Sequence, residues 1–243
     1  MRALAALFAL VALALPSATG AGGSFTVYAA ASLTQVFPKI SSKPRYSFAG
    51  SDQLALQLRQ GAPADVFASA SPKYTQLLYQ DGLVERPVTF ARNRLIVLVP
   101  ESNPANIHSV YDLRKSGVKV VIGDQGVPIG SYTRQLLDTL GIKDAVLRNV
   151  VSQETDVKGI VAKVALGEAD AGFVYRTDAK PVSARVLKVF LPKWAQPPVR
   201  YQVAIVKSTP RRVEARAFIR KVLSKRGRMQ LRRAGFGLPP KAH

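Results

Sequence analysis

The stretch RYSFAGSDQLALQLRQGAPADVFASA, residues 45–70, sets two apolar runs on either side of a segment with helical periodicity. The runs RYSFAG and DVFASA are typical of buried strands, and SDQLALQLRQG ends on Gly61, as helices commonly end on glycine. A strand, a helix and a second strand in this order form one unit of a largely parallel sheet. The stretch therefore predicts an α/β fold.

The same alternation continues along the chain. Further strands are expected in FTVYAA (25–30), RLIVLVP (94–100), KVVIGD (119–124), VLRNV (146–150), AGFVYR (171–176), VLKVFLP (186–192) and YQVAIV (201–206). Further helices are expected in SPKYTQLLYQDG (71–82), GSYTRQLLDTLG (130–141) and TDVKGIVAKVALGEA (155–169). The helix expected in SLTQVFPKI (32–40) contains Pro38, which removes a backbone hydrogen bond and should kink or shorten it.

Two extended, proline-flanked segments divide the chain. They are NRLIVLVPESNP (93–104) and PPVRYQVAIVK (197–207), about one hundred residues apart. Segments of this kind suit two crossings between lobes, where they would act as hinges. We therefore expect lobe 1 to comprise residues 24–95 plus 201–243, and lobe 2, residues 96–200, to be inserted into it.

The N-terminus and the composition indicate an exported protein. Residues 1–23 have one positive charge, an apolar run and small residues at the end, which is typical of a secretory signal peptide. The chain contains no cysteine, so thiolate metal sites, thiol nucleophiles and lipid-bearing cysteines are excluded. The net charge of +20 would suit nucleic acid, but export argues against that partner and favours steering of small anions. A general preference for exporting basic proteins would give the same composition.

The C-terminal segment, residues 210–243, contains eleven Lys or Arg and one acid, Glu214. Ala215, Phe218, Ile219 and Val222 recur at helical spacing, which predicts an amphipathic helix with a solvated basic face. Contact with a membrane surface or a transporter is the alternative role for this face.

Five turns lead from a strand into a helix: AAASL (29–33), FAGSDQL (48–54), GVPIGSY (126–132), ETDVKG (154–159) and VYRTD (174–178). Such turns gather at the carboxyl ends of the strands, where helix N-termini can bind an anion. Ser32 and Ser51 can each donate a hydroxyl and a backbone N–H, although each alone is more often a plain helix cap. Tyr175 can donate its phenol or be a core residue. Gly130 permits a close backbone approach.

Residues for catalysis or metal binding are few. A serine nucleophile needs a base, and the two histidines, His108 and His243, lie outside the candidate turns. The sequence has no pair of histidines and no carboxylate cluster at metal-binding spacing. We therefore expect neither an enzyme nor direct metal coordination.

The sequence resembles the periplasmic molybdate-binding proteins of ABC transporters, which also take tungstate. The resemblance rests on VYAAASL, FAGSDQLALQLRQGAPADVFASAS, NRLIVLVP, GDQGVPIGSYTRQLLDTLG, GEADAGFVYRTDA and YQVAIV, in the family's order. It implies the type II periplasmic binding protein fold, in which two α/β lobes, each a mixed, mostly parallel sheet flanked by helices, close on the ligand. It also implies that Ser32 and Ser51 bind through hydroxyl and N–H, Ile129 and Val157 through N–H, and Tyr175 through its phenol.

Two positions depart from the family pattern. Ile129 stands where a small residue is usual, which is tolerable if only its N–H faces the ligand. Asp52 follows Ser51 where Ser or Thr is common, and a carboxylate in the site would repel an anion. We expect Asp52 to point outward, near the positive end of its helix and beside a basic residue.

The expected function is capture of molybdate, possibly tungstate, in the periplasm and delivery to the membrane permease of an ABC transporter. The protein would need no cofactor, bind no nucleic acid and act as a monomer. A binding protein for sulfate, phosphate or a small carboxylate is the first alternative, and an extracytoplasmic enzyme is the second.

Overall fold

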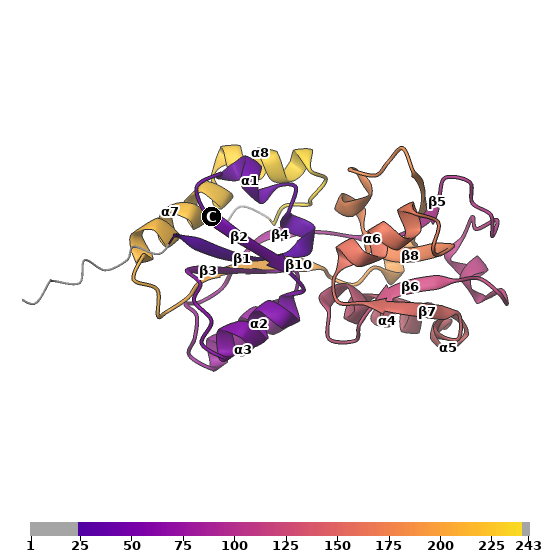
Figure 1. Cartoon of the computed structure of the whole chain (residues 1–243), viewed down its shortest axis with the longest axis horizontal. Helices are drawn as coiled ribbons and strands as arrows, with labels where there is room; N and C mark the ends of the chain where they lie inside the picture. The colour runs from indigo at the N-terminus through magenta and orange to yellow at the C-terminus, as the bar shows by residue number, and fades with distance from the viewer. Residues whose placement is uncertain (1–23, 240–243) are drawn as a thin grey trace, which may run out of the picture.

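The computed structural model describes residues 24–239, in which two five-stranded sheets lie side by side (Figure 1). The predicted signal peptide, residues 1–23, and His243 lie outside the described residues. None of the helices between residues 24 and 239 is long and apolar enough to cross a membrane.

Sheet 1 has the strand order β2-β1-β3-β10-β4. Its strands are β1 (Thr26–Ala30), β2 (Arg45–Ala49), β3 (Val66–Ser69), β4 (Val88–Arg92) and β10 (Arg200–Ile205). Helices α2 (Ser51–Arg59) and α3 (Pro72–Gln80) cover one face, and α1 (Phe37–Ile40), α7 (Arg212–Leu223) and α8 (Lys225–Arg233) cover the other (Figure 1). We call this layered unit lobe 1.

Sheet 2 has the corresponding order β7-β6-β8-β5-β9. Its strands are β5 (Leu95–Pro100), β6 (Val120–Gly123), β7 (Val150–Glu154), β8 (Ala171–Tyr175) and β9 (Val186–Phe190). Its helices are α4 (Pro128–Thr139), α5 (Lys143–Leu147) and α6 (Val157–Ala165). Sheet 2 with these helices is lobe 2.

Short 3-10 helices connect the elements of the two lobes. They are η1 (Ala31–Leu33), η2 (Val110–Arg114), η3 (Arg176–Ala179) and η4 (Lys193–Ala195).

Buried apolar strands build the core of each lobe. Every residue of β3, β5 and β8 is buried, which matches their nearly continuous apolar sequences. A separate apolar cluster joins α2 and α3 to sheet 1 through residues such as Leu54, Leu58, Phe67 and Leu78. Burial of these side chains fixes where each helix N-terminus lies.

The chain crosses between the sheets twice, from β4 to β5 and from β9 to β10, and the two crossings are bonded to each other. The amide of Asn93 donates to the carbonyl of Val199 at 3.2 Å. The side chain of Gln196 accepts from the amide of Leu95 at 2.9 Å and donates to its carbonyl at 2.8 Å. We infer that the lobes are divided at these two crossings, beside the predicted boundaries 95/96 and 200/201.

The sheets are mixed, as predicted: β10 and β5 each run antiparallel to both of their neighbours, and the other four strands of each sheet run in one direction. Two local predictions need correction. The VLRNV segment is not a strand: residues 143–147 form α5, whose Val146 is fully buried, and the strand begins only at Val150. Strand β4, which has the sequence VTFAR, was not predicted.

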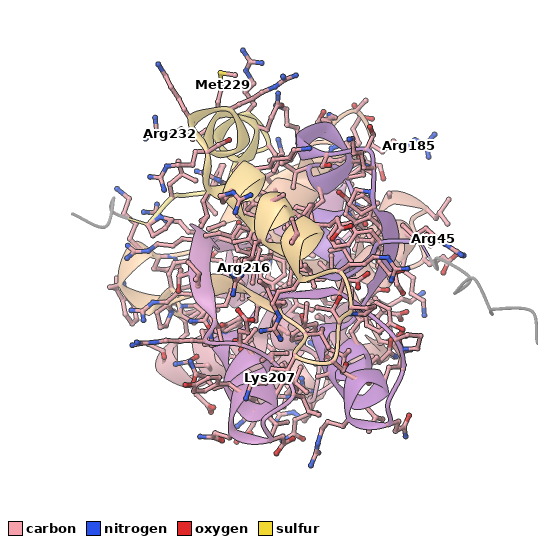
Figure 2. All side chains as sticks on the ribbon, turned by 90° about the vertical axis from the view of Figure 1, so that its left-hand side faces the viewer. Arg45, Arg185, Lys207, Arg216, Met229 and Arg232 are labelled. Atoms are coloured by element: carbon pink, nitrogen blue, oxygen red, sulfur yellow. The ribbon has the colours of Figure 1, made fainter. Side chains whose placement is uncertain are left out.

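The segment 32–40 forms a shorter helix than its length would allow, and the C-terminal segment is divided at Ser224. Pro38 lies in the first turn of the four-residue α1, so the segment 32–40 is shortened as predicted. The C-terminal segment forms two helices instead of one, because Ser224 ends α7 and its hydroxyl caps α8 by accepting from the amide of Gly227 at 3.1 Å. Figure 2 shows basic side chains distributed around this end of the molecule, among them Arg216 and Arg232.

Gly130 allows the first turn of α4 to lie against the end of β6. A Cβ atom at this position would be 2.0 Å from the carbonyl oxygen of Asp124 and 2.3 Å from that of Gly123. The close backbone approach predicted from GVPIGSY is therefore confirmed, and it holds the N-terminus of α4 at the strand ends.

Candidate anion-binding cleft

A small cavity between the lobes is formed by the carboxyl ends of the parallel strands. Residues at or just after the ends of β1, β2 and β3 in lobe 1 and of β6, β7 and β8 in lobe 2 contribute to it. It is lined by Ala30, Ala31, Ser32, Ala49, Gly50, Ser51, Ala70, Val127, Pro128, Ile129, Asp156, Val157 and Tyr175. The structure thus brings all five predicted site residues, Ser32, Ser51, Ile129, Val157 and Tyr175, to one cavity.

The cavity is small for a ligand site. Its volume is about 20 Å³, whereas pockets for drug-sized ligands span roughly 300–1,000 Å³. With the lobes in this arrangement it accommodates one small ion and excludes larger solutes.

Helix N-termini supply backbone donors to the cavity. Ser51, Ile129 and Val157 lie in the first turns of α2, α4 and α6, where amides have no intrahelical partner. At α2 and α4 no side chain caps these amides. At α6 the carboxylate of Asp156 accepts from the amides of Lys158 and Gly159, at 2.6 and 3.3 Å. It does not accept from the amide of Val157, which can therefore donate to a ligand.

Ser51 is buried, and its hydroxyl oxygen accepts a hydrogen bond from the amide of Ala70 at 3.1 Å. Within residues 24–239 this hydroxyl donates to no other group. Because this hydroxyl accepts from Ala70 and donates to no group in the described residues, its hydrogen is left for a ligand.

Tyr175 is 2% exposed, and its buried hydroxyl has no hydrogen-bond partner among the described residues. Burial raises the pKa of this phenol well above its usual value, and the neighbouring Tyr201 raises it further. The phenol therefore stays protonated at neutral pH. A buried donor without an acceptor costs free energy, on the order of 1–3 kcal/mol, unless a ligand satisfies it.

Tyr201, Asn93 and Thr177 form a buried polar chain behind Ser32 that the sequence did not predict. The hydroxyls of Ser32 and Tyr201 are 2.8 Å apart. The amide nitrogen of Asn93 donates to the hydroxyl of Thr177 at 3.0 Å and weakly to that of Tyr201 at 3.4 Å. Tyr201 is the second residue of β10, which was predicted as a strand, and nothing in its local sequence indicates a partner 169 positions away.

The cavity has no cationic lining. Among its described lining residues there is no Lys or Arg, and Asp156, bonded to backbone amides, is the one acid. Lys158, in the first turn of α6, forms an ion pair with the buried Asp178 at 2.8 Å. A ligand in the cavity would be held by neutral dipoles.

Asp52 does not line the cavity, as expected, but it has no basic partner. No ion pair in the described part of the chain includes Asp52, and its Oδ1 atom is buried without a hydrogen-bond partner. Its carboxylate lies beside the backbone of Gly126 in lobe 2. Burial raises the pKa of Asp52, and the charge of Asp124 in lobe 2 adds to that effect. The charge of nearby Lys73 acts in the opposite direction and lowers this pKa, but the two residues form no ion pair in the described part of the chain.

Close backbone approaches join the lobes beside the cavity. A Cβ atom on Gly50 of lobe 1 would be 2.5 Å from the carbonyl oxygen of Thr155 in lobe 2. The hydroxyl of Tyr74 in lobe 1 donates to the carbonyl of Gly126 in lobe 2. The small size of the cavity thus depends on a glycine at position 50.

Groups for catalysis or metal binding are not assembled in the described residues. No cluster of three or more His, Asp or Glu side chains suitable for a metal occurs within residues 24–239. His108 is exposed in lobe 2, where its ring contacts Asn106 at 2.7 Å, and it does not line the cavity.

Comparisons with known proteins agree with this architecture. The molybdate-binding protein ModA of Mycobacterium tuberculosis is 38% identical over 226 residues, which cover 89% of this chain and 85% of that protein. The periplasmic molybdate-binding protein of Azotobacter vinelandii has a similar structure, with a TM-score of 0.77 and 24% identity over 88% of this chain and 99% of that chain.

A sulfate-binding relative has nearly the same fold. The sulfate-binding protein SubI of M. tuberculosis matches with a TM-score of 0.76 and 18% identity, over 89% of this chain and 87% of that chain. The family model for bacterial extracellular solute-binding proteins matches residues 25–237. The chain therefore belongs to the bacterial extracellular solute-binding protein family.

Proposed function

We propose that this protein captures molybdate, and also tungstate, outside the cytoplasm and delivers it to the membrane permease of an ABC transporter. The single observation that supports this most directly is the unpartnered hydroxyl of Tyr175 in a small cavity between the lobes whose described lining contains hydroxyl and amide donors and no Lys or Arg. A tetrahedral dianion would accept from Tyr175, Ser32 and Ser51 and from the amides of Ile129 and Val157. The protein would act as a periplasmic monomer after removal of residues 1–23.

The charge of the ligand follows from the donor set. First-turn amides can only donate, and the hydroxyls of Ser51 and Tyr175 beside them have hydrogens that no described group accepts, so this donor set suits a ligand rich in acceptors. The positive ends of three helix dipoles favour an anion in the same place. Without a salt bridge to break, release depends on separation of the lobes, which a transporter can control.

The hydroxyl of Ser32 becomes a donor through Tyr201. Burial raises the pKa of Tyr201 well above its usual value, so its phenol keeps its proton. Asn93 donates to the phenol oxygen, and the phenol proton is then directed to the oxygen of Ser32, 2.8 Å away. The hydrogen of Ser32 is left for the anion. We therefore assign Tyr201 as a positioning residue.

The choice of molybdate over sulfate rests on sequence, because the fold alone does not discriminate. TM-scores of 0.77 and 0.76 link the chain equally to molybdate- and sulfate-binding structures. The 38% identical relative is named as a molybdate-binding protein. Donors fixed for a large tetrahedron leave a smaller one with unmade hydrogen bonds, each costing on the order of 1 kcal/mol or more.

Calorimetric titration of the chain without residues 1–23 tests this function. We expect one molybdate or tungstate ion to bind per chain, and sulfate and phosphate to bind about a hundredfold more weakly, which two unmade hydrogen bonds would produce. Sulfate binding as tight as molybdate binding would reject the assignment in favour of a general anion carrier.

Gly50→Ala should weaken molybdate binding at least about tenfold, because its Cβ would lie 2.5 Å from the backbone oxygen of Thr155 and keep the lobes apart. The Cβ would also lie 2.6 Å from the carboxylate of Asp52 in the same lobe, but that group ends a side chain that can rotate away, so the melting temperature without ligand should remain close to that of the parent protein. Calorimetry and thermal melts measure the two effects.

The matched control for this variant is Gly126→Ala in the facing loop. Its Cβ would be 3.4 Å from the carboxylate of Asp52, an ordinary contact distance. We expect molybdate affinity within about twofold of the parent protein. Equal affinities for Gly50→Ala and the parent protein would show that closure at this contact is not needed for binding.

Tyr201→Phe should lower molybdate affinity by about three- to tenfold, the effect of one hydrogen bond, while the ring keeps its packing against Tyr175. The control is Tyr46→Phe, which removes a partly buried hydroxyl bonded to the carbonyl of Ser41 at 2.6 Å in lobe 1. The control should lose thermal stability but not affinity. Unchanged affinity in Tyr201→Phe would refute the positioning role.

A further inference from the structure

A second pocket, separate from the anion cavity, lies against the two crossings between the lobes. Its volume is about 460 Å³, within the range typical of small-molecule sites. Residues 92–94 of the first crossing and 196–200 of the second contribute to it, together with Gly235 and Gly237 from the C-terminal segment. It shares no lining residue with the anion cavity.

The side chains of this pocket are strongly cationic. Its described lining contains no acidic residue and five basic ones, Arg92, Arg94, Arg176, Lys193 and Arg200. Ion pairs do occur elsewhere on the protein, for instance between Arg59 and Asp81, but within residues 24–239 none of the five pocket cations forms one. We call these five residues the hinge cations.

Backbone hydrogen bonds fix the hinge cations relative to one another. The amide of Arg176 donates to the carbonyl of Arg94 at 2.9 Å. Arg92 exchanges two backbone hydrogen bonds with Gly237, at 2.7 and 2.9 Å. The guanidinium of Arg176 donates to the carbonyl of Gly235 at 2.8 Å. The backbones of Arg92, Arg94 and Arg176 are therefore held at one concave surface, which Lys193 and Arg200 also line.

We propose that this pocket binds a small polyanion with two or more phosphate or carboxylate groups. Four of the hinge cations are arginines, whose planar guanidinium groups match the two oxygens of a phosphate or carboxylate. A single monovalent ion would leave most of the positive charge uncompensated, whereas a polyanion neutralises several cations at once. The pocket is also too large for one tetrahedral ion to contact all of its walls.

The polyanion would also stabilise the arrangement in which the lobes meet. Arg92 and Arg200 belong to strands of sheet 1, whereas Arg176 and Lys193 belong to lobe 2. A ligand that bridges them opposes their mutual repulsion in the arrangement that also encloses the anion cavity. Because coupling between two binding sites is reciprocal, the polyanion should then tighten molybdate binding. This second consequence rests on the proposed function, but the binding itself does not.

The test is calorimetric titration with tripolyphosphate, and separately with citrate, at fixed ionic strength and without molybdate. We expect one-to-one binding of at least one of the two probes. The double variant Arg94→Ala, Arg176→Ala should weaken it about tenfold or more, through loss of charge-assisted hydrogen bonds. Lys193→Glu, a change at an exposed side chain, should also weaken it and serves if the double variant is unstable.

The control is a second double variant that also removes two positive charges, but at positions outside the pocket. Arg185 and Arg216 are exposed cations (Figure 2). They do not line the pocket, and neither forms an ion pair within the described residues. Arg185→Ala with Arg216→Ala should change affinity less than about twofold. Equal losses in the two double variants, or no saturable binding of either probe, would overturn the site, since the protein would then attract polyanions only through its net charge.

A second titration measures molybdate affinity with the probe at saturation. We expect it to rise at least about threefold in the parent protein and not in Arg94→Ala, Arg176→Ala. Unchanged or weaker molybdate binding would overturn the coupling. Absence of molybdate binding under all conditions would instead refute the proposed function, and the titrations without molybdate would still decide the hinge site.

Discussion

Buried hydrogen-bond donors without acceptors are the constraint on which this structure depends. The phenol of Tyr175 has no partner, Ser51 already accepts from Ala70, and the first-turn amides of α2 and α4 have no side-chain cap. Each unsatisfied donor costs on the order of 1–3 kcal/mol when water is excluded. These groups meet only when the lobes meet, so an anion that satisfies them stabilises closure.

The topology explains how so many donors reach one point. Both sheets have the same strand order, and in each the fourth position is occupied by the strand that has just crossed from the other lobe. The three parallel strands of each sheet therefore direct their carboxyl ends, and the helices that follow them, toward the gap between the lobes. Tyr201 links the crossing to the cavity, because its ring packs edge-on against Tyr175 and its hydroxyl contacts Ser32.

The positive charges of the protein lie outside the anion cavity, so they can attract an anion without binding it directly. Basic residues occupy the outer surface and the pocket at the crossings, while the lining of the anion cavity contains no Lys or Arg in the described chain. A positive exterior raises the local concentration of anions. A cavity of oriented neutral dipoles then selects by size and donor geometry instead of by charge alone.

Sequence periodicity was sufficient for most strands and for the strand-to-helix turns, because buried strands and amphipathic helices have distinct spacing. It failed at Val146, whose β-branched neighbourhood resembles a strand although tertiary packing makes it helical. The helical spacing of Ala215, Phe218 and Val222 correctly located α7, but it gave no sign of the cap at Ser224 that begins a second helix. The five donor positions came from turn chemistry and family resemblance, whereas Tyr201 and the enclosure of Asp52 depend on contacts between lobes that no local pattern encodes.

The central claim is that uncharged donors from both lobes enclose a doubly negative tetrahedron. The most direct measurement is a crystal structure of the protein with tungstate or molybdate, in which anomalous scattering locates the metal atom. The account predicts one anomalous peak in the cavity, with the oxyanion bonded to the hydroxyls of Ser32, Ser51 and Tyr175 and with no Lys or Arg side chain in hydrogen-bonding distance. A peak at another place, or a lysine or arginine in direct contact with the oxyanion, would contradict it.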